Sequence, residues 1–156
     1  MSHYLIEQFK FARMSAINYV KDLNGNQVEA VPTGLNNNIK WNLGHQYVVV
    51  EKFAFLLTGE KAKIPANFQK LFNPGTSPKD WSMESPKKDE LIALLTEQMK
   101  KVESLLSDRL EDPIENVYKT STGLEISSVG GCLSFCLYHE GMHFGAIKHI
   151  KQLSQK

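Results

Sequence analysis

The sequence predicts an all-α protein, a four-helix bundle with long connecting loops, and three observations support this. Four segments repeat apolar residues every three or four positions, the spacing that lines one face of a helix. Capping and turn residues of the kind that bound helices flank these segments. No segment shows a convincing alternation of apolar and polar residues, so no strand is expected. A chain of 156 residues suits a single domain, which we expect to cover residues 1–156.

Two helices are expected in the first half of the chain, at about residues 4–23 and 38–57. The buried side of the first is the series Leu5, Phe9, Ala12, Ala16 and Tyr19. The buried side of the second is the series Trp41, His45, Val49, Phe53 and Leu56. Asn38 is a plausible N-cap for the second helix, and Thr58-Gly59 is a natural end.

Two further helices are expected in the second half. The third begins at Ser85-Pro86, with proline at the first helical position, and ends at Asp112-Pro113. Its buried side is Leu91, Leu95, Val102 and Leu106. The fourth begins near Ser127 or Ser128 and runs almost to the C-terminus. Its apolar stripe is Val129, Cys132, Cys136, His139, His143, Ala146 and Ile150.

Two connections, residues 24–37 and 59–84, are unusually long for a small domain. The second is broken by prolines and contains a short expected helix around Phe68, Leu71 and Phe72. Loops of this length serve either as lids and binding segments or as plain crossover connections, and both interpretations stay open.

Composition narrows the possible functions. The formal net charge of +1 gives no argument for an electrostatic nucleic-acid binder. No apolar run approaches the roughly 20 residues of a membrane helix, and the N-terminus lacks the apolar core of a signal peptide, so a cytoplasmic location is expected. Cys132 and Cys136 are four apart on a helix, an awkward geometry for a disulfide, and we expect them to pack as small hydrophobes.

The segment His139-Glu140-Gly141-Met142-His143 predicts a metal site. Histidines four apart on a helix stand one turn above each other and can bind one ion. His45, on the apolar stripe of another helix, is the candidate third ligand. Three imidazoles leave coordination positions open for water or substrate, and they suit zinc or nickel first, with iron, manganese or copper as alternatives. The alternative is a set of core or interface histidines with ordinary hydrogen bonds.

The same segment fits the H-E-x-x-H motif of zinc peptidases, in which the glutamate is the general base. Three features argue against a peptidase. On a continuous helix His149 lies about 80° around the axis from His139, too far for a third ligand. Ala146 stands where the extended motif needs a glycine, and only seven residues follow His149. Glu140 is therefore expected to support a ligand or face solvent rather than act as a base.

Three segments together resemble the DinB superfamily, the DinB/YfiT-like metal-dependent enzymes. Residues 38–45 resemble its tryptophan-and-histidine segment at the start of the second helix, and residues 123–127 resemble the glycine-containing turn into its last helix. Residues 139–145 resemble its closing His-x-x-x-His segment with a nearby glycine. Ala146 departs from the pattern, since many relatives carry glutamine there.

The resemblance implies an up-down-down-up bundle, frequent homodimers, and a divalent metal held by His45, His139 and His143. Better-understood relatives include transferases that use a low-molecular-weight thiol such as bacillithiol or mycothiol. We therefore expect a metal-dependent enzyme acting on a small molecule, either a thiol-dependent S-transferase or a hydrolase. No nucleic-acid or membrane partner is expected.

Other residues are weaker candidates for this site. Glu140, Asn42 and Tyr138 are candidates for orienting a ligand or handling protons. Trp41, Trp81 and Phe72 are candidates for pocket walls, or else simple core residues. Two other functions stay open: a non-catalytic metal-binding or stress-response module, and a structural helical dimer whose histidines are only hydrogen-bonded.

Overall fold

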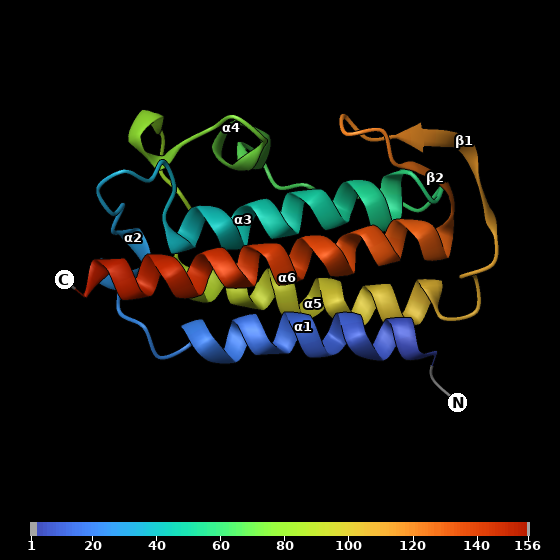
Figure 1. Ribbon diagram of the computed structural model, residues 1–156, viewed down its shortest axis with the longest axis horizontal. Coiled ribbons are helices and arrows are strands. Elements are labelled where there is room, and N and C mark those ends of the chain that lie inside the picture. The colour runs from blue at the N-terminus through green and yellow to red at the C-terminus, as the bar shows by residue number, and fades with distance from the viewer. Residues whose placement is uncertain (1–2, 156) are drawn as a thin grey trace.

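Four long helices lie side by side in the computed structural model, which describes residues 3–155 (Figure 1). They are α1 (Tyr4–Val20), α3 (Ile39–Val50), α5 (Lys88–Leu106) and α6 (Val129–Ser154). Helix α1 packs against α5 and α6, and α3 packs against the same two. The colours in Figure 1 show that α1 and α6 run in one direction, while α3 and α5 run in the other. The protein is therefore mostly helical, as the sequence predicts.

Most helix ends agree with the predicted ones to within a few residues, but the predicted end of the third helix at Asp112-Pro113 is wrong, because α5 already ends at Leu106. The Asn38 side chain caps α3 by accepting a hydrogen bond of 2.7 Å from Trp41 N, and Ser128 caps α6 by accepting one of 3.0 Å from Gly131 N. Helix α1 ends at Val20, before the predicted end at residue 23, and α5 starts at Lys88 rather than at Ser85-Pro86.

The second predicted helix is continuous, but its last part is a π-helix rather than an α-helix. After Val50 the chain continues as the π-helix η1 (Glu51–Leu56), in which Leu57 N donates to Lys52 O, five residues back, over 2.9 Å. Single-turn π segments of this kind occur frequently at functional sites.

The expectation of an all-α chain is wrong in one place. Strands β1 (Pro113–Lys119) and β2 (Glu125–Ser128) form an antiparallel hairpin between α5 and α6 (Figure 1). Tyr118 pairs with Ile126, and the register is irregular between Pro113 and Tyr118. Few residues of the hairpin are buried, so the alternation that marks a strand is too short to be recognised in the sequence.

The two long connections contain short helices. Residues 24–37 hold α2 (Gly25–Glu29), which the sequence did not predict. Residues 59–84 hold α4 (Phe68–Phe72), at the predicted position, and the 3₁₀ turn η2 (Pro78–Asp80). None of the helices in the described part of the chain is long and apolar enough to cross a membrane.

A buried polar layer divides the core of the protein into two apolar clusters. One cluster includes Phe9, Phe55 and Leu133, and the other includes Leu43, Leu95 and Ile147. The layer between them takes one residue from each long helix: Arg13, Gln46, Gln98 and Glu140. Each of these side chains is at most 2% exposed. His139 directly precedes the layer residue Glu140, and His45 directly precedes Gln46, so the histidines lie at the same height.

Candidate metal centre

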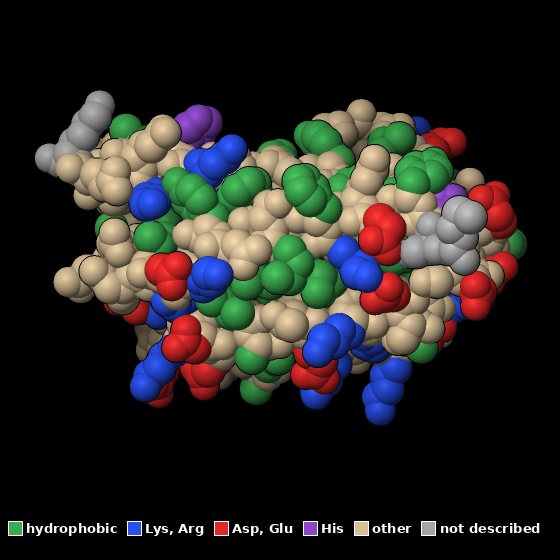
Figure 2. All heavy atoms as spheres, turned by 90° about the horizontal axis from the view of Figure 1, so that it is seen from below, with side chains coloured by type: hydrophobic (Ala, Val, Ile, Leu, Met, Phe, Trp, Pro, Cys, Tyr) green, Lys and Arg blue, Asp and Glu red, His purple; other side chains and the backbone are tan. Residues whose placement is uncertain are grey.

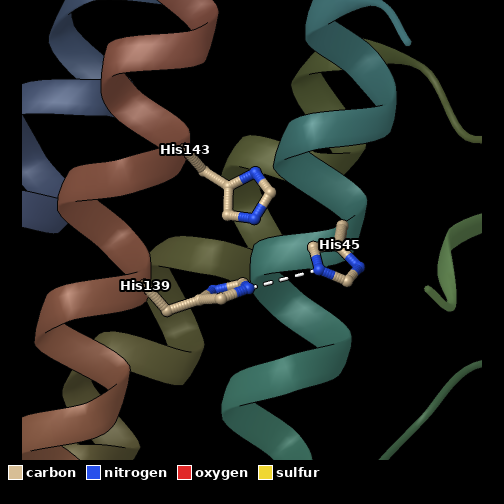
Figure 3. Close-up of side chains that lie close together, drawn as sticks. All are labelled: His45, His139 and His143. Atoms are coloured by element: carbon tan, nitrogen blue, oxygen red, sulfur yellow. Dashed lines mark hydrogen bonds between the residues drawn. The ribbon is translucent and has the colours of Figure 1, made fainter. Parts of the chain in front are cut away.

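Three histidine side chains converge between α3 and α6 (Figure 3). His139 and His143 extend from successive turns of α6 toward His45 on α3. The Nε2 atoms of His45 and His139 lie 3.2 Å apart, and one ring nitrogen from each of the three histidines lies within 4.8 Å of the others. Two nitrogens bound to one tetrahedral zinc ion are separated by about 3.3 Å, so the observed spacing suits a shared ion.

Hydrogen bonds fix the tautomers of two of these histidines. His45 Nδ1 donates to the backbone carbonyl of Phe72 over 2.6 Å. His143 Nδ1 donates to Asn42 Oδ1 over 2.7 Å, and the amide orientation is set because Asn42 Nδ2 donates to Asn38 O over 2.8 Å. Both rings therefore keep their proton on Nδ1 and leave Nε2 as a lone-pair donor, the arrangement found in metal-bound histidines.

His139 is the least satisfied of the three. Its Nδ1 atom is buried and lacks a hydrogen-bond partner within the described residues. His45 Nε2 carries no proton and can only accept, so the contact between the two Nε2 atoms is a hydrogen bond only if His139 Nε2 carries the proton and donates it. Buried polar atoms without partners are rare in folded proteins, and sites that bind an ion are one setting in which they occur. A hydrogen-bonded cluster leaves one of these rings poorly satisfied because a single proton at most fits between the two Nε2 atoms, whereas a bound cation would accept the Nε2 lone pairs of all three rings.

The site holds its histidines in the neutral form that binds metals. Burial, followed by the neighbouring His143 and His45, lowers the pKa of His139 to about 2. Burial and His45 lower the pKa of His143 to about 4. Burial also lowers the pKa of His45, against the opposing effect of the Phe72 carbonyl. Neutral imidazoles need no deprotonation before they coordinate.

A glycine on α3 allows the Phe72 carbonyl to reach His45. A Cβ atom on Gly44 would lie 2.4 Å from the Phe72 ring, so only glycine permits α4 to pack this closely. The Trp41 ring stacks on the His45 ring with 4.5 Å between the ring centres. Its Nε1 donates to Thr76, in the connection of residues 59–84 that also contains α4. Trp81 Nε1 donates to Leu71 O. These aromatic residues hold the loop against α3, and they do not line the pocket beside the histidines.

The Glu140 carboxylate points away from the metal centre into the polar layer. It forms a two-pronged ion pair with Arg13, through Nε at 2.9 Å and Nη2 at 2.7 Å, and both side chains are fully buried. Arg13 also donates to Leu95 O and Gln98 Oε1. The alternative that Glu140 faces solvent is therefore wrong. A carboxylate held in this way has no access to water, which agrees with the argument against a peptidase.

A pocket of about 510 Å³ opens beside the centre, and His45 and His139 form part of its wall. Its apolar side includes Val49, Phe53 and Phe135. The connection of residues 59–84 contributes Ile64, Gln69, Asn73 and Pro74, and the hairpin contributes Tyr118, Thr120 and Ser121. The long connection is thus more than a crossover, because it lines the pocket and supplies the carbonyl that orients His45.

Residues 8–147 match the sequence model of the DinB superfamily. The chain belongs to the DinB superfamily. A solved crystal structure, described as the conserved protein of locus from Enterococcus faecalis, is similar over 99% of this chain and 98% of that one, with a TM-score of 0.74 and 13% identity. At that identity the likeness supports the shared fold alone. A comparison with curated proteins finds no significant match.

Not every candidate residue of this DinB-superfamily chain lies at the centre. Tyr138 is 65% exposed, and its ring contacts Phe135 rather than the histidines. His149 is exposed on α6, and the Nδ1 atom of His3 accepts a hydrogen bond from Leu5 N at the start of α1. Cys132 and Cys136 are buried free thiols, as expected, and burial raises the pKa of Cys132 to about 11.

Two functional elements of this DinB-superfamily site were missed by the sequence analysis. The Phe72 carbonyl belongs to the backbone and leaves no signal in the sequence. Arg13 did leave one, because it lies on the helix face of Phe9 and Ala16, where a charged residue is out of place unless it is paired.

Proposed function

We propose that this DinB-superfamily protein is a metal-dependent enzyme built on a four-helix bundle, with one divalent cation, zinc or nickel, held by His45, His139 and His143. The observation that carries the proposal is the convergence of three neutral imidazoles beside a pocket large enough for a small molecule. Nitrogen donors alone suit these two ions better than magnesium or calcium, which prefer oxygen.

Within this proposal, the chain's own residues prepare the ligands before an ion arrives. The Phe72 carbonyl orients His45, and the Asn42 amide orients His143, each through the ring Nδ1 proton. Partners of this kind fix the ring orientation and raise the basicity of the coordinating nitrogen. The assignment of Asn42 to ligand support is therefore favoured over direct proton transfer.

We favour thiol transfer over hydrolysis as the reaction. A bound divalent cation supplies a Lewis acid that lowers the pKa of a thiol or a water molecule. Hydrolysis also benefits from a carboxylate base near the nucleophile, yet no aspartate or glutamate belongs to the described residues that line the pocket. A thiol, with a free pKa of about 8.5, needs less assistance. In the transfer, a sulfur–carbon bond forms, the bond from carbon to its leaving group breaks, and the thiol proton departs with that group.

Metal analysis of purified variants tests the site. Alanine at His45, His139 or His143 is expected to remove most of the zinc or nickel that the wild-type protein retains after dialysis. His149→Ala is the matched control, because this histidine lies exposed on the same helix as two of the proposed ligands. Full metal content in all three triad variants would refute the proposed centre.

The reaction is tested by mixing metal-loaded protein with monochlorobimane and a series of low-molecular-weight thiols. Conjugation that requires the metal supports the transferase, and its absence with every thiol counts against it. A protein that binds its metal firmly but conjugates nothing would instead be the non-catalytic metal-binding or stress-response module.

We also propose that the protein forms a homodimer through the exposed side of α1 and α6. Four large apolar side chains on these helices face solvent, each at least 48% exposed: Tyr4, Phe11, Tyr138 and Met142. Figure 2 shows hydrophobic side chains gathered along the middle of one face, with most acidic and basic side chains below them and toward the two ends. Light scattering of the wild type and of Phe11→Glu tests this, since the substitution should produce monomers.

A further inference from the structure

We propose that Lys52 is the binding site for an anionic group of the substrate, so that the enzyme acts on small amphipathic acids. The inference rests on the proposed function in one respect, since it takes the histidines as the place where the other end of the substrate reacts. Lys52 belongs to the pocket wall and is the only lysine or arginine among the described residues that form it.

The ammonium group of Lys52 has polar and aromatic partners but no carboxylate. Its Nζ donates to the Tyr118 hydroxyl over 2.9 Å and lies over two rings, 4.7 Å from the centre of Tyr118 and 5.5 Å from that of Phe53. No aspartate or glutamate in residues 3–155 forms an ion pair with it. Lysines at protein surfaces need no partner, but this one is half-buried beside a pocket.

The pocket as a whole therefore carries a positive charge that its own residues do not balance. Besides Lys52 it contains neutral histidines, amides, hydroxyls and apolar side chains. A partly desolvated ammonium group with two free N–H donors attracts a carboxylate, sulfonate or phosphate more strongly than a neutral group. The Tyr118 hydroxyl can orient the same anion, because it already contacts Nζ.

Spacing along the helix sets the size of the ligand. Lys52 follows His45 by seven residues, two turns of helix, which corresponds to about 10 Å along the axis. Val48, Val49 and Phe53 lie along this stretch of the pocket wall. The structure thus favours a substrate with an anionic group at one end, an apolar middle, and the reacting atom at the end near the histidines.

The test compares an acid with its neutral amide. Binding of 4-phenylbutyrate and 4-phenylbutanamide is measured by titration calorimetry on the full chain, first without metal and then after zinc loading. The metal-free arm is decisive, because a carboxylate could otherwise bind the zinc itself. In that arm we expect the acid to bind about tenfold more tightly than the amide, the effect of one charge-assisted hydrogen bond.

Three variants assign that preference to the ammonium group. Lys52→Met should abolish the preference for the acid, and Lys52→Arg should retain it. Lys100→Met, which removes the same charge from an exposed position on α5, should leave it unchanged. Melting temperatures establish that each variant is folded.

Equal binding of acid and amide by the wild type, or an undiminished preference in Lys52→Met, would overturn the inference. These outcomes are separate from those of the metal experiment. An acid preference without any metal retention would overturn the metal centre alone, whereas metal retention without an acid preference would overturn the role of Lys52 alone.

Discussion

His45 and His139 face each other across the α3–α6 interface with 3.2 Å between their Nε2 atoms, and one proton at most can occupy that contact. His45 already uses its Nδ1 proton to bind the Phe72 carbonyl, so its Nε2 can only accept. A cation in place of the shared proton would accept the lone pairs of both Nε2 atoms, and the His139 proton would then lie on Nδ1, which has no partner among the described residues. This relationship is the reason that a metal fits the site.

Loss of the Asn42 amide should weaken metal binding without removing any ligand. Asn42→Ala leaves the His143 ring free to rotate and to change tautomer, and comparable changes in other proteins lower metal affinity by about 10- to 100-fold. Competition with a coloured chelator measures this affinity. Asn18→Ala, at an exposed position of α1, is the control. An unchanged affinity in Asn42→Ala would mean that the hydrogen bond to His143 is incidental.

A methyl group at Gly44 should disturb both packing and the site. The new Cβ would overlap the Phe72 ring, and the displaced α4 would carry its carbonyl away from His45. We expect Gly44→Ala to lower the free energy of unfolding by about 1–3 kcal/mol. Gly141→Ala is the matched helical control: its Cβ meets nothing within 4 Å, so a gain of up to about 1 kcal/mol is expected. Urea unfolding measures the free energy of unfolding of both variants. Equal changes in the two would contradict a close contact between Gly44 and Phe72.

Removal of Arg13 should cost far more than removal of a surface charge. Arg13→Met leaves the Glu140 carboxylate buried and unpaired, which costs about 3–5 kcal/mol. Lys10→Met, which breaks the solvent-screened pair with Glu103, should have little effect on the free energy of unfolding. The double variant Arg13→Met/Glu140→Gln should recover part of the loss, because the unpaired charge is then gone. Similar costs for the two single variants, measured by urea unfolding, would argue against a structural role for the buried pair.

The metal-free protein should lose stability as the pH falls below 6.5. The unfolded chain protonates His139 near its ordinary pKa of 6.5, whereas the folded chain keeps this ring neutral down to a pKa of about 2. Titration of His139 therefore leaves the free energy of unfolding unchanged above pH 6.5 and lowers it as the pH falls from 6.5 toward 2. At pH 5, His139 alone should lower the free energy of unfolding by about 2 kcal/mol relative to neutral pH.

Unfolding free energies at pH 7.5 and pH 5, measured without metal, test this dependence. His139→Gln should reduce this pH dependence without abolishing it, because the pKa values of His143 and His45 are also lowered, and His149→Gln should leave it unchanged. A wild-type protein equally stable at both pH values would contradict the burial of neutral histidines.

The sequence predicted the parts of the structure that depend on periodicity. Apolar spacing gave the four long helices, and it placed His45 and His139 on stripes that face the core, where the structure brings them together. The hairpin was missed because Ile114 and Ile126 are its only buried apolar residues, too few to form a recognisable pattern. The path of residues 59–84, and with it the Phe72 carbonyl, depends on tertiary contacts such as Gly44 against Phe72, which no local pattern encodes.

The polar layer fixes the register of the helices that carry the three histidines. A slip of α6 by one turn, about 5.4 Å, would carry His139 past His45 and would also move Glu140 from Arg13 into apolar surroundings. A misaligned chain would therefore carry an uncompensated charge in its interior and be selected against during folding. The Arg13–Glu140 ion pair thus favours the helix register in which the histidines are also aligned.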